Sequence, residues 1–275
     1  MTFQPLPPAR HYAPQYIGPV TWLVRQVSEA TGAPMCVYIN SLVITGAEPV
    51  IVDTGSPSNR VQWLEDVFGI VEPADVRWVF LSHDDVDHTG NLADVMARCP
   101  NATLVCSWAL VERFSNAFAF PLERCRWVND GERFDAGDRT LRAARPPLYD
   151  SPTTRGLLDE RTGIYWGVDA FATPMPAPLA TVSDLDQPFW AQGHATFALG
   201  GIAPWATLVD DARYQAEVDR FAALGASAIA GAHTPLIPAS HVPAAIDLLR
   251  AVPTAEVPAA PDQAVLDAIR GQAAA

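Results

Sequence analysis

The sequence has 275 residues, of which 49% are hydrophobic and 18% charged, so the chain can bury a sizeable core and is not a disordered polymer. All 18 basic residues are arginines, which excludes the chemistry of a lysine Schiff base. With 31 acidic residues the formal net charge is −13, which argues against a nucleic-acid partner or an anionic membrane surface.

Strand-like and helix-like stretches alternate along the chain, and this alternation predicts an α/β fold. Residues 1–34 are rich in proline and aromatic side chains and are expected to form an N-terminal arm or an edge hairpin. The predicted strands that follow cover 36–45, 49–52, 76–81, 102–106, 125–128, 140–144, 155–158, 164–168 and 226–230. The predicted helices cover about 56–68, 92–98, a stretch that begins near 108, 211–224 and 243–251.

Three details of this pattern are specific enough to test. In the first predicted helix, Val61, Leu64 and Val67 have the spacing of one buried face. The segment 172–205 contains five prolines and is expected to be a long loop or a short helical insert, which often covers a site. The Ala- and Pro-rich end, 252–275, is predicted to be a loosely attached tail. Because no linker divides the chain, we expect one domain over 1–275.

The cysteines and the apolar stretches suggest where the protein resides. The four cysteines are scattered, and each lies in or beside an apolar stretch, which predicts reduced thiols in the core. The first residues lack the basic and apolar regions of an export signal. No stretch reaches the roughly 18 consecutive apolar residues of a membrane span. We therefore expect a cytoplasmic protein without a membrane partner.

Two histidines and three aspartates lie within six positions, His83-Asp84-Asp85-Val86-Asp87-His88, directly after the predicted strand 76–81. Side chains can converge where a chain leaves a sheet. Imidazole nitrogen and carboxylate oxygen together form the mixed ligand set of zinc, iron or manganese sites. The cluster therefore predicts the nucleus of a site for two metal ions, with a loop of capping aspartates as the alternative.

A second acidic motif, Asp53-Thr54-Gly55, follows the predicted strand 49–52. It matches the nucleophile loop of aspartic proteases, but those enzymes need two carboxylates and no second D-T-G occurs. We interpret Asp53 instead as an acceptor that orients a ligand imidazole. The sequence has no G-x-S-x-G, P-loop or G-x-G-x-x-G motif, so serine-hydrolase, phosphate-cradle and Rossmann interpretations lack support.

Residues His83 to His88 resemble the H-x-H-x-D-H signature of the metallo-β-lactamase superfamily. Three further landmarks occur in matching order, namely D-T-G at 53–55, Trp166-Gly167-Val168-Asp169-Ala170-Phe171 and Ala230-Gly231-Ala232-His233-Thr234-Pro235. The resemblance covers roughly residues 35–250. It implies a four-layer αββα sandwich in which Asp169 bridges two metals and His233 is the last histidine ligand.

Asp85 departs from this signature, because it stands where the second histidine is expected and gives H-x-D-x-D-H. The departure resembles the flavodiiron and oxygen-binding diiron branch, in which a carboxylate takes this position. That resemblance implies two non-haem irons that react with O2 or NO. A carboxylate in place of an imidazole also hardens the site and adds negative charge, which favours iron or manganese over zinc.

Asp150, in Pro147-Leu148-Tyr149-Asp150-Ser151-Pro152, is a second departure, because the family normally has a histidine there. If Asp150 binds, the resemblance implies one metal held by His83, Asp85, Asp150 and Asp169, and another held by Asp87, His88, His233 and Asp169. His194, in the segment 172–205, is the alternative extra ligand or lid residue of the first site.

Three functions follow from these patterns. The first is a diiron oxidoreductase-like protein that binds or reduces O2 or NO; the sequence ends without a flavodoxin domain, so no bound flavin domain is expected and a separate partner would supply electrons. The second is a hydrolase in which a metal-bound hydroxide attacks an ester, thioester or phosphodiester and Asp87 orients the water. The third is a degenerate, non-catalytic metal-binding protein. Relatives that self-associate make a homodimer reasonable.

Overall fold

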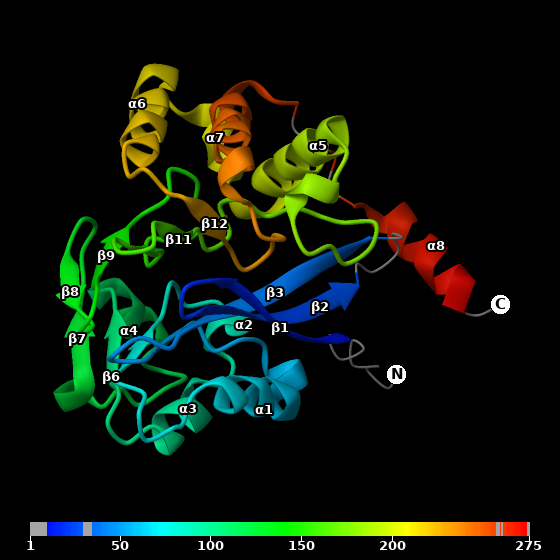
Figure 1. The fold of residues 1–275 in the computed structure, drawn as a ribbon. Coiled ribbons are helices and arrows are strands. Elements are labelled where there is room, and N and C mark those ends of the chain that lie inside the picture. The colour runs from blue at the N-terminus through cyan, green and yellow to red at the C-terminus, as the bar shows by residue number, and fades with distance from the viewer. Residues whose placement is uncertain (1–9, 30–34, 257–258, 260, 274–275) are drawn as a thin grey trace.

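Two β-sheets face each other in the computed structural model, which describes residues 10–29, 35–256, 259 and 261–273 (Figure 1). The first sheet has the strand order β1-β2-β3-β4-β5-β6-β7 and the second the order β12-β11-β10-β9-β8. The first sheet consists of β1 (Arg10–Gly18), β2 (Thr21–Glu29), β3 (Cys36–Ile44), β4 (Val50–Val52), β5 (Trp78–Phe80), β6 (Thr103–Cys106) and β7 (Cys125–Trp127). The second consists of β8 (Arg133–Asp135), β9 (Thr140–Ala144), β10 (Gly156–Asp159), β11 (Ile164–Trp166) and β12 (Ala228–Ala230).

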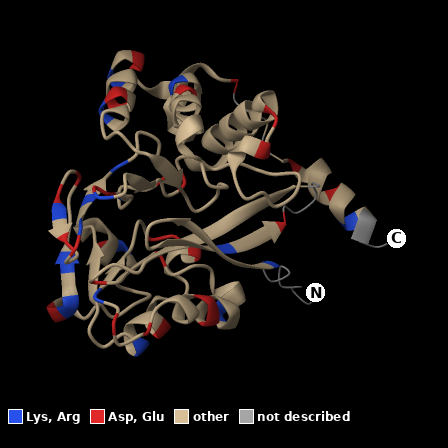
Figure 2. Ribbon diagram, in the orientation of Figure 1, with Lys and Arg blue, Asp and Glu red and all other residues tan. Residues whose placement is uncertain are grey.

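Helices cover the outer face of each sheet. The helices are α1 (Arg60–Ile70), α2 (Val86–Thr89), α3 (Leu92–Arg98), α4 (Trp108–Phe114), α5 (Gln187–Phe197), α6 (Asp211–Ala222), α7 (Val242–Ala251) and α8 (Gln263–Ala273). In Figure 1, α1 and α3 lie below the first sheet and α5, α6 and α7 lie above the second. Figure 2 shows Asp and Glu on helices of both outer layers. Of the helices in the described residues, none is long and apolar enough to cross a lipid bilayer.

The two sheets divide the core into separate apolar layers, because side chains alternate between the two faces of each strand. In β4, Val50 and Val52 pack between the sheets, whereas Ile51 faces the layer of α1, α3 and α4. Tyr165 of β11 faces the opposite helical layer and packs with residues of α5, α6 and α7. Because successive side chains of a strand point to opposite faces, each short strand contributes to two cores. The predicted four-layer αββα sandwich is confirmed.

The structure differs from the sequence-based prediction in the first helix. Val61, expected on the buried face, is 72% exposed, while Trp63 is fully buried. The Trp63 indole donates to Ser41 Oγ at 3.1 Å. The prediction for Val61 was wrong because two apolar stripes share Leu64 and Val67, and burying the larger Trp63 ring removes more apolar surface from water.

Three other segments resolve alternatives that the sequence left open. Residues 10–29 form the edge hairpin rather than an arm, since β1 pairs with β2 and β2 pairs with β3. The remainder of the predicted arm, 1–9 and 30–34, lies outside the described residues. The segment 172–205 contains α5 and is therefore a helical insert. The predicted tail contains α8, which the sequence analysis did not expect and whose described side chains are almost all exposed.

Strand direction explains why the predicted ligands meet. Strands β4 and β5 are parallel, and so are β11 and β12, so the carboxyl ends within each pair lie together. Asp53 follows β4, the cluster 82–88 follows β5, Asp169 follows β11 and His233 follows β12. Side chains that emerge from carboxyl ends of parallel strands are well placed to converge on one site.

Candidate metal centre

Four side chains surround one space, which we call the first half-site. His83 Nε2 lies 3.7 Å from Asp85 Oδ2, 3.7 Å from Asp150 Oδ2 and 3.2 Å from Asp169 Oδ2. Two donors bound to one ion at about 2.1 Å each are separated by roughly 3–3.5 Å. The distances between these atoms are therefore close to the distances between two ligand atoms of one metal ion. Asp150 lies in the group as the sequence predicted.

A second space, the second half-site, lies on the other side of Asp169. His88 Nε2 is 3.2 Å from Asp169 Oδ1 and 3.7 Å from Asp87 Oδ2. His233 Nε2 is 3.3 Å from the same Asp169 oxygen and 3.2 Å from Asp87 Oδ2. All seven residues predicted as ligands lie in three overlapping groups of candidate donors, namely His83, His88 and Asp169; Asp87, His88 and His233; and His83, Asp85 and Asp150. Asp169 links the two half-sites, because its Oδ2 lies near His83 and its Oδ1 lies near His88 and His233.

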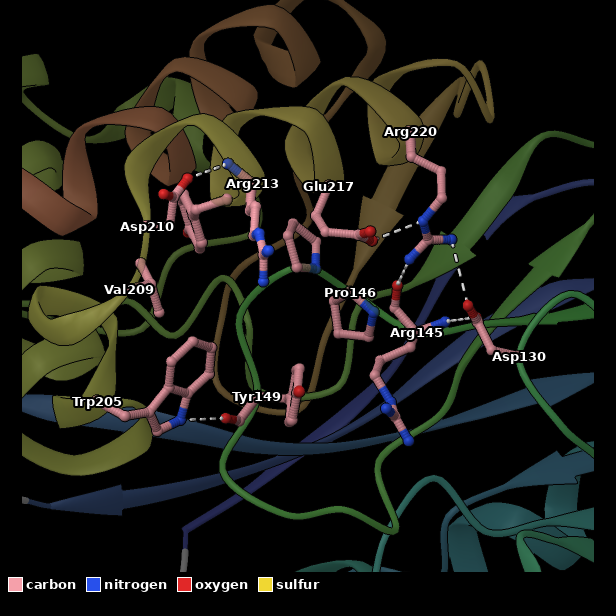
Figure 3. Close-up of a pocket in the computed structure, with 12 residues that line it drawn as sticks. Asp130, Arg145, Pro146, Tyr149, Trp205, Val209, Asp210, Arg213, Glu217 and Arg220 are labelled. Atoms are coloured by element: carbon pink, nitrogen blue, oxygen red, sulfur yellow. Dashed lines mark hydrogen bonds and ion pairs between the residues drawn. The ribbon is translucent and has the colours of Figure 1, made fainter.

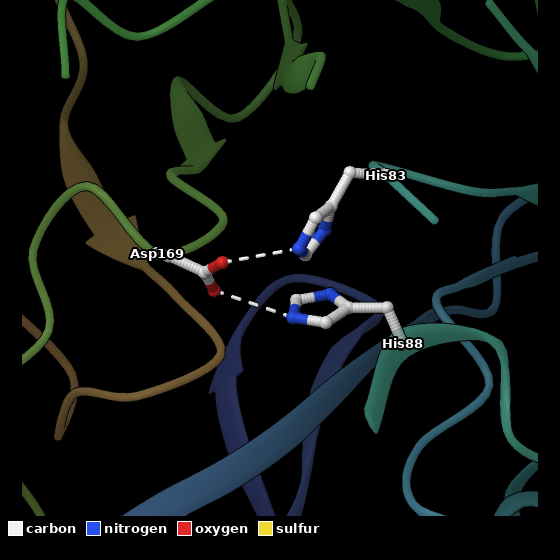
Figure 4. A group of neighbouring side chains, drawn as sticks. All are labelled: His83, His88 and Asp169. Atoms are coloured by element: carbon white, nitrogen blue, oxygen red, sulfur yellow. Dashed lines mark ion pairs between the residues drawn. The ribbon is translucent and has the colours of Figure 1, made fainter. Parts of the chain in front are cut away.

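The carboxylate of Asp169 stands between the two half-sites. Figure 4 shows one of its oxygens directed at His83 and the other at His88. The Nε2 atoms of His83 and His88 and the Oδ1 atom of Asp169 are buried without a hydrogen-bond partner among the described residues. A buried polar atom without a partner is costly, so these three atoms fit a pair of metal ions and not a dry core.

Asp53 orients the imidazole ring of His88 in the second half-site. Its carboxylate accepts hydrogen bonds from Ser82 N at 2.7 Å, Ser82 Oγ at 2.6 Å and Trp166 Nε1 at 2.9 Å. It also lies 2.9 Å from His88 Nδ1, which leaves Nε2 of that ring directed toward Asp169. His233 is oriented in the same way, because its Nδ1 lies 2.7 Å from the carbonyl oxygen of Tyr38. Such contacts set ring orientation and basicity in metal sites.

Asp84, which lies between His83 and Asp85 in the sequence, belongs to no group of candidate metal donors among the described residues. Its carboxylate accepts hydrogen bonds from Arg113 Nε at 2.6 Å, Ser151 Oγ at 2.9 Å and Thr153 Oγ1 at 2.7 Å. It thereby joins the loop of His83 and Asp85 to the loop of Asp150. We call these contacts the Asp84 brace. The sequence signal was present in the polar Ser151-Pro152-Thr153, but spacing alone could not pair it with Asp84.

Replacing Asp84 with Ala is expected to weaken metal binding at the first half-site about 10–100-fold, the usual cost of losing a group that orients a ligand. The second half-site, whose ligands contact Asp53 and Tyr38, should keep its affinity. Competition with a chelator at known metal concentration measures both constants. Asp94→Ala, which removes a carboxylate paired with Arg60 on the surface, is the control. An equal loss of affinity for both ions would contradict the role of Asp84 in supporting the first half-site.

The structure does not bring His194 into either half-site. The ring is buried on α5 and hydrogen-bonds to the backbone of Ala172. Burial lowers the pKa of His194 to about 4 despite that hydrogen bond. It belongs to no group of candidate metal donors among the described residues. His194 therefore lies apart from the candidate donors, because the segment that carries it folds as a packed helix.

The metal-free centre attracts positive charge. Burial and the His88 ring disfavour a charged His83, but the carboxylates of Asp169 and Asp85 outweigh both and raise the pKa of His83 from 6.5 to about 10. Burial also opposes a charged His88, yet the surrounding carboxylates hold its pKa well above the usual value. The Asp150 carboxyl group is instead shifted toward its neutral form, because burial and the negative charge of Asp169 raise its pKa. Two metal cations would balance the negative charge of these carboxylates in place of the protons.

The metal-free protein is therefore expected to lose stability as pH rises. A histidine whose pKa is raised on folding contributes stability that is complete below its unfolded value of 6.5 and lost as pH passes about 10. Thermal melts of chelator-treated protein between pH 6.5 and pH 10 should show a falling Tm, whereas the metal-loaded protein should change less. A Tm of the chelator-treated protein that stays constant or rises would contradict the assignment.

Comparison with known proteins gives one family. The model of the ODP family beta lactamase matches residues 37–192, which is more than half of the chain. A putative diflavin flavoprotein A 1 from Nostoc sp. is 30% identical over 133 residues, which cover 48% of this chain and 23% of that protein. An anaerobic nitric oxide reductase flavorubredoxin from Pectobacterium atrosepticum is 22% identical over 133 residues, covering 48% and 26%. The aligned part thus spans about a quarter of these relatives.

Solved structures share the fold over nearly the whole chain. Rubredoxin oxygen:oxidoreductase from Desulfovibrio gigas superposes with a TM-score of 0.74 and 15% identity, covering 86% of this chain and 60% of that one. A fragment of putative diflavin flavoprotein A 5 from Nostoc sp. superposes with a TM-score of 0.73 and 17% identity, covering 90% and 98%. At these identities the likeness shows the fold alone.

Proposed function

Because this chain belongs to the ODP family of beta lactamases, we propose that it is a dinuclear non-haem iron protein that binds or reduces O2 or NO with electrons from a separate partner. The observation that carries the proposal is Asp169, whose two carboxylate oxygens each face one group of metal donors. A flavorubredoxin described as a nitric oxide reductase and an oxygen:oxidoreductase are among the similar proteins, which supports the choice of reaction.

The donor set also favours iron over zinc. Two iron ions bound here would bind O2 or NO and would pass to it the electrons that the separate partner supplies. Four of the seven ligands are aspartates, and carboxylates suit harder metals than imidazole does. The buried residues His83, His88 and Asp169 hold the inner side of the centre. Their function would be to fix the two ions at a constant separation.

Access to the centre runs past the carboxylates. The side chain of Asp85 is 56% exposed, whereas those of His83 and His88 are buried. Asp87, the candidate catalytic residue, lies at an intermediate depth and contacts His233. A small molecule would therefore approach from the side of Asp85, and Asp87 would be positioned to orient it.

Metal content of the full chain, purified after expression in medium replete with iron and zinc, tests the proposal. We expect two irons per chain and an absorption band that changes with O2. Reduced protein should then consume O2 or NO when a chemical reductant is supplied. Stoichiometric zinc together with esterase or phosphodiesterase activity would favour a hydrolase and overturn the proposal. Less than one metal per chain would also overturn it and would indicate a degenerate site.

A further inference from the structure

A cavity of about 580 Å³ lies between helix α6 and the loop that leads from β9 to Asp150 (Figure 3). We call it the α6 cavity. Its volume falls within the range of about 300–1,000 Å³ that is usual for ligand sites. Aromatic, arginine and carboxylate side chains all line it. We propose that the α6 cavity binds a small aromatic anion, a function separate from that of the metal centre.

The rings of Trp205 and Tyr149 form an aromatic wall of the cavity. Their centroids are 5.2 Å apart, and their planes are inclined by 50°. Trp205 Nε1 donates to the carbonyl oxygen of Tyr149 at 3.0 Å, so the two residues are held together without a ligand. Both residues are only half-buried. Aromatic surface that remains open in this way offers a stacking partner to the ring of a ligand.

Arg145 places a positive charge against the same wall. Its guanidinium carbon lies 4.9 Å from the centroid of the Tyr149 ring. The guanidinium is held there by the carbonyl oxygens of Thr154 and Pro152, which accept from its Nε at 3.2 Å and its Nη2 at 2.9 Å. Among the described residues, no carboxylate pairs with this guanidinium. The fixed charge would repel a cationic ligand and attract an anionic one.

Arg213 supplies a second positive charge. Its side chain extends from α6 toward the loop of Pro146, as Figure 3 shows. Among the residues that the structure describes, none accepts a hydrogen bond from the Arg213 guanidinium or forms an ion pair with it. A carboxylate, sulfonate or phosphate group of a ligand is the acceptor that a free guanidinium fits best.

The three carboxylates of the cavity already have partners in the protein. Asp130 and Glu217 lie 3.4 and 2.7 Å from guanidinium nitrogens of Arg220. Asp210 accepts a hydrogen bond from the backbone N–H of Arg213 at 3.0 Å and thereby caps α6. The charge of the Arg213 side chain is therefore left for a ligand. The aromatic wall would take the ring of that ligand, and Arg213 its negative group.

Isothermal titration calorimetry of the full chain with naphthalene-2-sulfonate tests the proposal. This flat aromatic anion is chosen because Tyr149 precedes Asp150 of the metal centre, and a sulfonate is a weaker metal ligand than a carboxylate. We expect one binding site per chain. The neutral methyl naphthalen-2-yl sulfone, which has nearly the same shape, should bind roughly tenfold more weakly because it lacks the charge that Arg213 meets.

Three variants identify the contacts. Arg213→Gln should weaken sulfonate binding roughly tenfold and should leave the affinity for the neutral sulfone unchanged. Trp205→Leu should weaken the binding of both probes several-fold and alike, because it removes stacking but no charge. Arg77→Gln is the matched control, since Arg77 lines a different cavity that contains carboxylates but no aromatic ring among its described residues. That variant should leave both Kd values unchanged.

Three results would overturn the proposal. They are no binding of the sulfonate at millimolar concentration, equal affinity of the wild-type chain for the sulfonate and the sulfone, and equal weakening by Arg77→Gln and Arg213→Gln. Arg213 is exposed, so its Gln variant is expected to keep the wild-type Tm, and a thermal melt checks this. Because the probes report on the α6 cavity and metal analysis reports on the centre, the proposed function stands or falls separately.

Discussion

Replacing Asp169 with Asn is expected to lower the affinity for each metal ion by at least about 100-fold, the upper end of what a lost supporting contact alone costs. Asn keeps the size of the side chain but removes the charge and one of the two oxygens that face the half-sites. Because both ions share this carboxylate, both should be lost together. Metal analysis after gel filtration should show fewer than one ion per chain, and O2 or NO consumption should disappear.

The matched control for Asp169→Asn is Asp184→Asn, which removes an exposed carboxylate on the same half of the chain. That variant should keep the wild-type metal content. Retention of one full equivalent by Asp169→Asn would show that one half-site binds without the bridge. Retention of two equivalents would contradict the assignment of Asp169 altogether.

Replacing Asp53 with Ala is expected to destabilise the protein by about 3–5 kcal/mol, the range for breaking a buried charge pair. The carboxylate is fully buried, and its loss leaves donors on Ser82, His88 and Trp166 without their acceptor. His88 would also lose the contact that directs it at the second half-site. Denaturant unfolding measures the first effect, and chelator competition measures the second.

Two variants separate the charge of Asp53 from its shape. Asp53→Asn keeps one acceptor oxygen and should lose less stability than Asp53→Ala, while still weakening the second half-site. Asp66→Ala removes an aspartate that pairs with His11 near the surface, and it should cost no more than about 1 kcal/mol. Similar losses for Asp53→Ala and Asp66→Ala would show that burial of the Asp53 network carries no special weight.

The candidate ligands could be named from the sequence because four motifs resemble those of a known superfamily and occur in matching order. His83, Asp169 and His233 come directly after apolar stretches, and parallel pairing places their strand ends together. What could not be predicted was the partner of Asp84. The resemblance set Asp85 and Asp87, but not Asp84, among the candidate ligands, and the structure places the Asp84 carboxylate against Arg113. That contact joins residues 29 positions apart, which spacing along the chain does not reveal.

The fold was predictable at the level of layers and less so for individual helices. Val61 and Trp63 are both apolar, and which one is buried depends on the rotation of α1 against the sheet. Residues Arg10–Gly18 and Thr21–Glu29 pair with each other, and Thr21–Glu29 also pairs with β3, a partner that a local pattern does not identify. His194 was predicted as an extra ligand or lid residue because the segment 172–205 was expected to cover a site, but that segment packs into the core through Trp190.

The seven candidate ligands come from both sheets of the sandwich. His83, Asp85, Asp87 and His88 follow a strand of the first sheet, while Asp150, Asp169 and His233 lie in loops of the second. Bound metal ions would therefore link the two sheets, which come from an earlier and a later part of the chain. Cooperative unfolding depends on such links, so metal loading should govern whether the two halves come apart together or in sequence. The proposed metal centre would thus also determine whether the molecule unfolds as one unit.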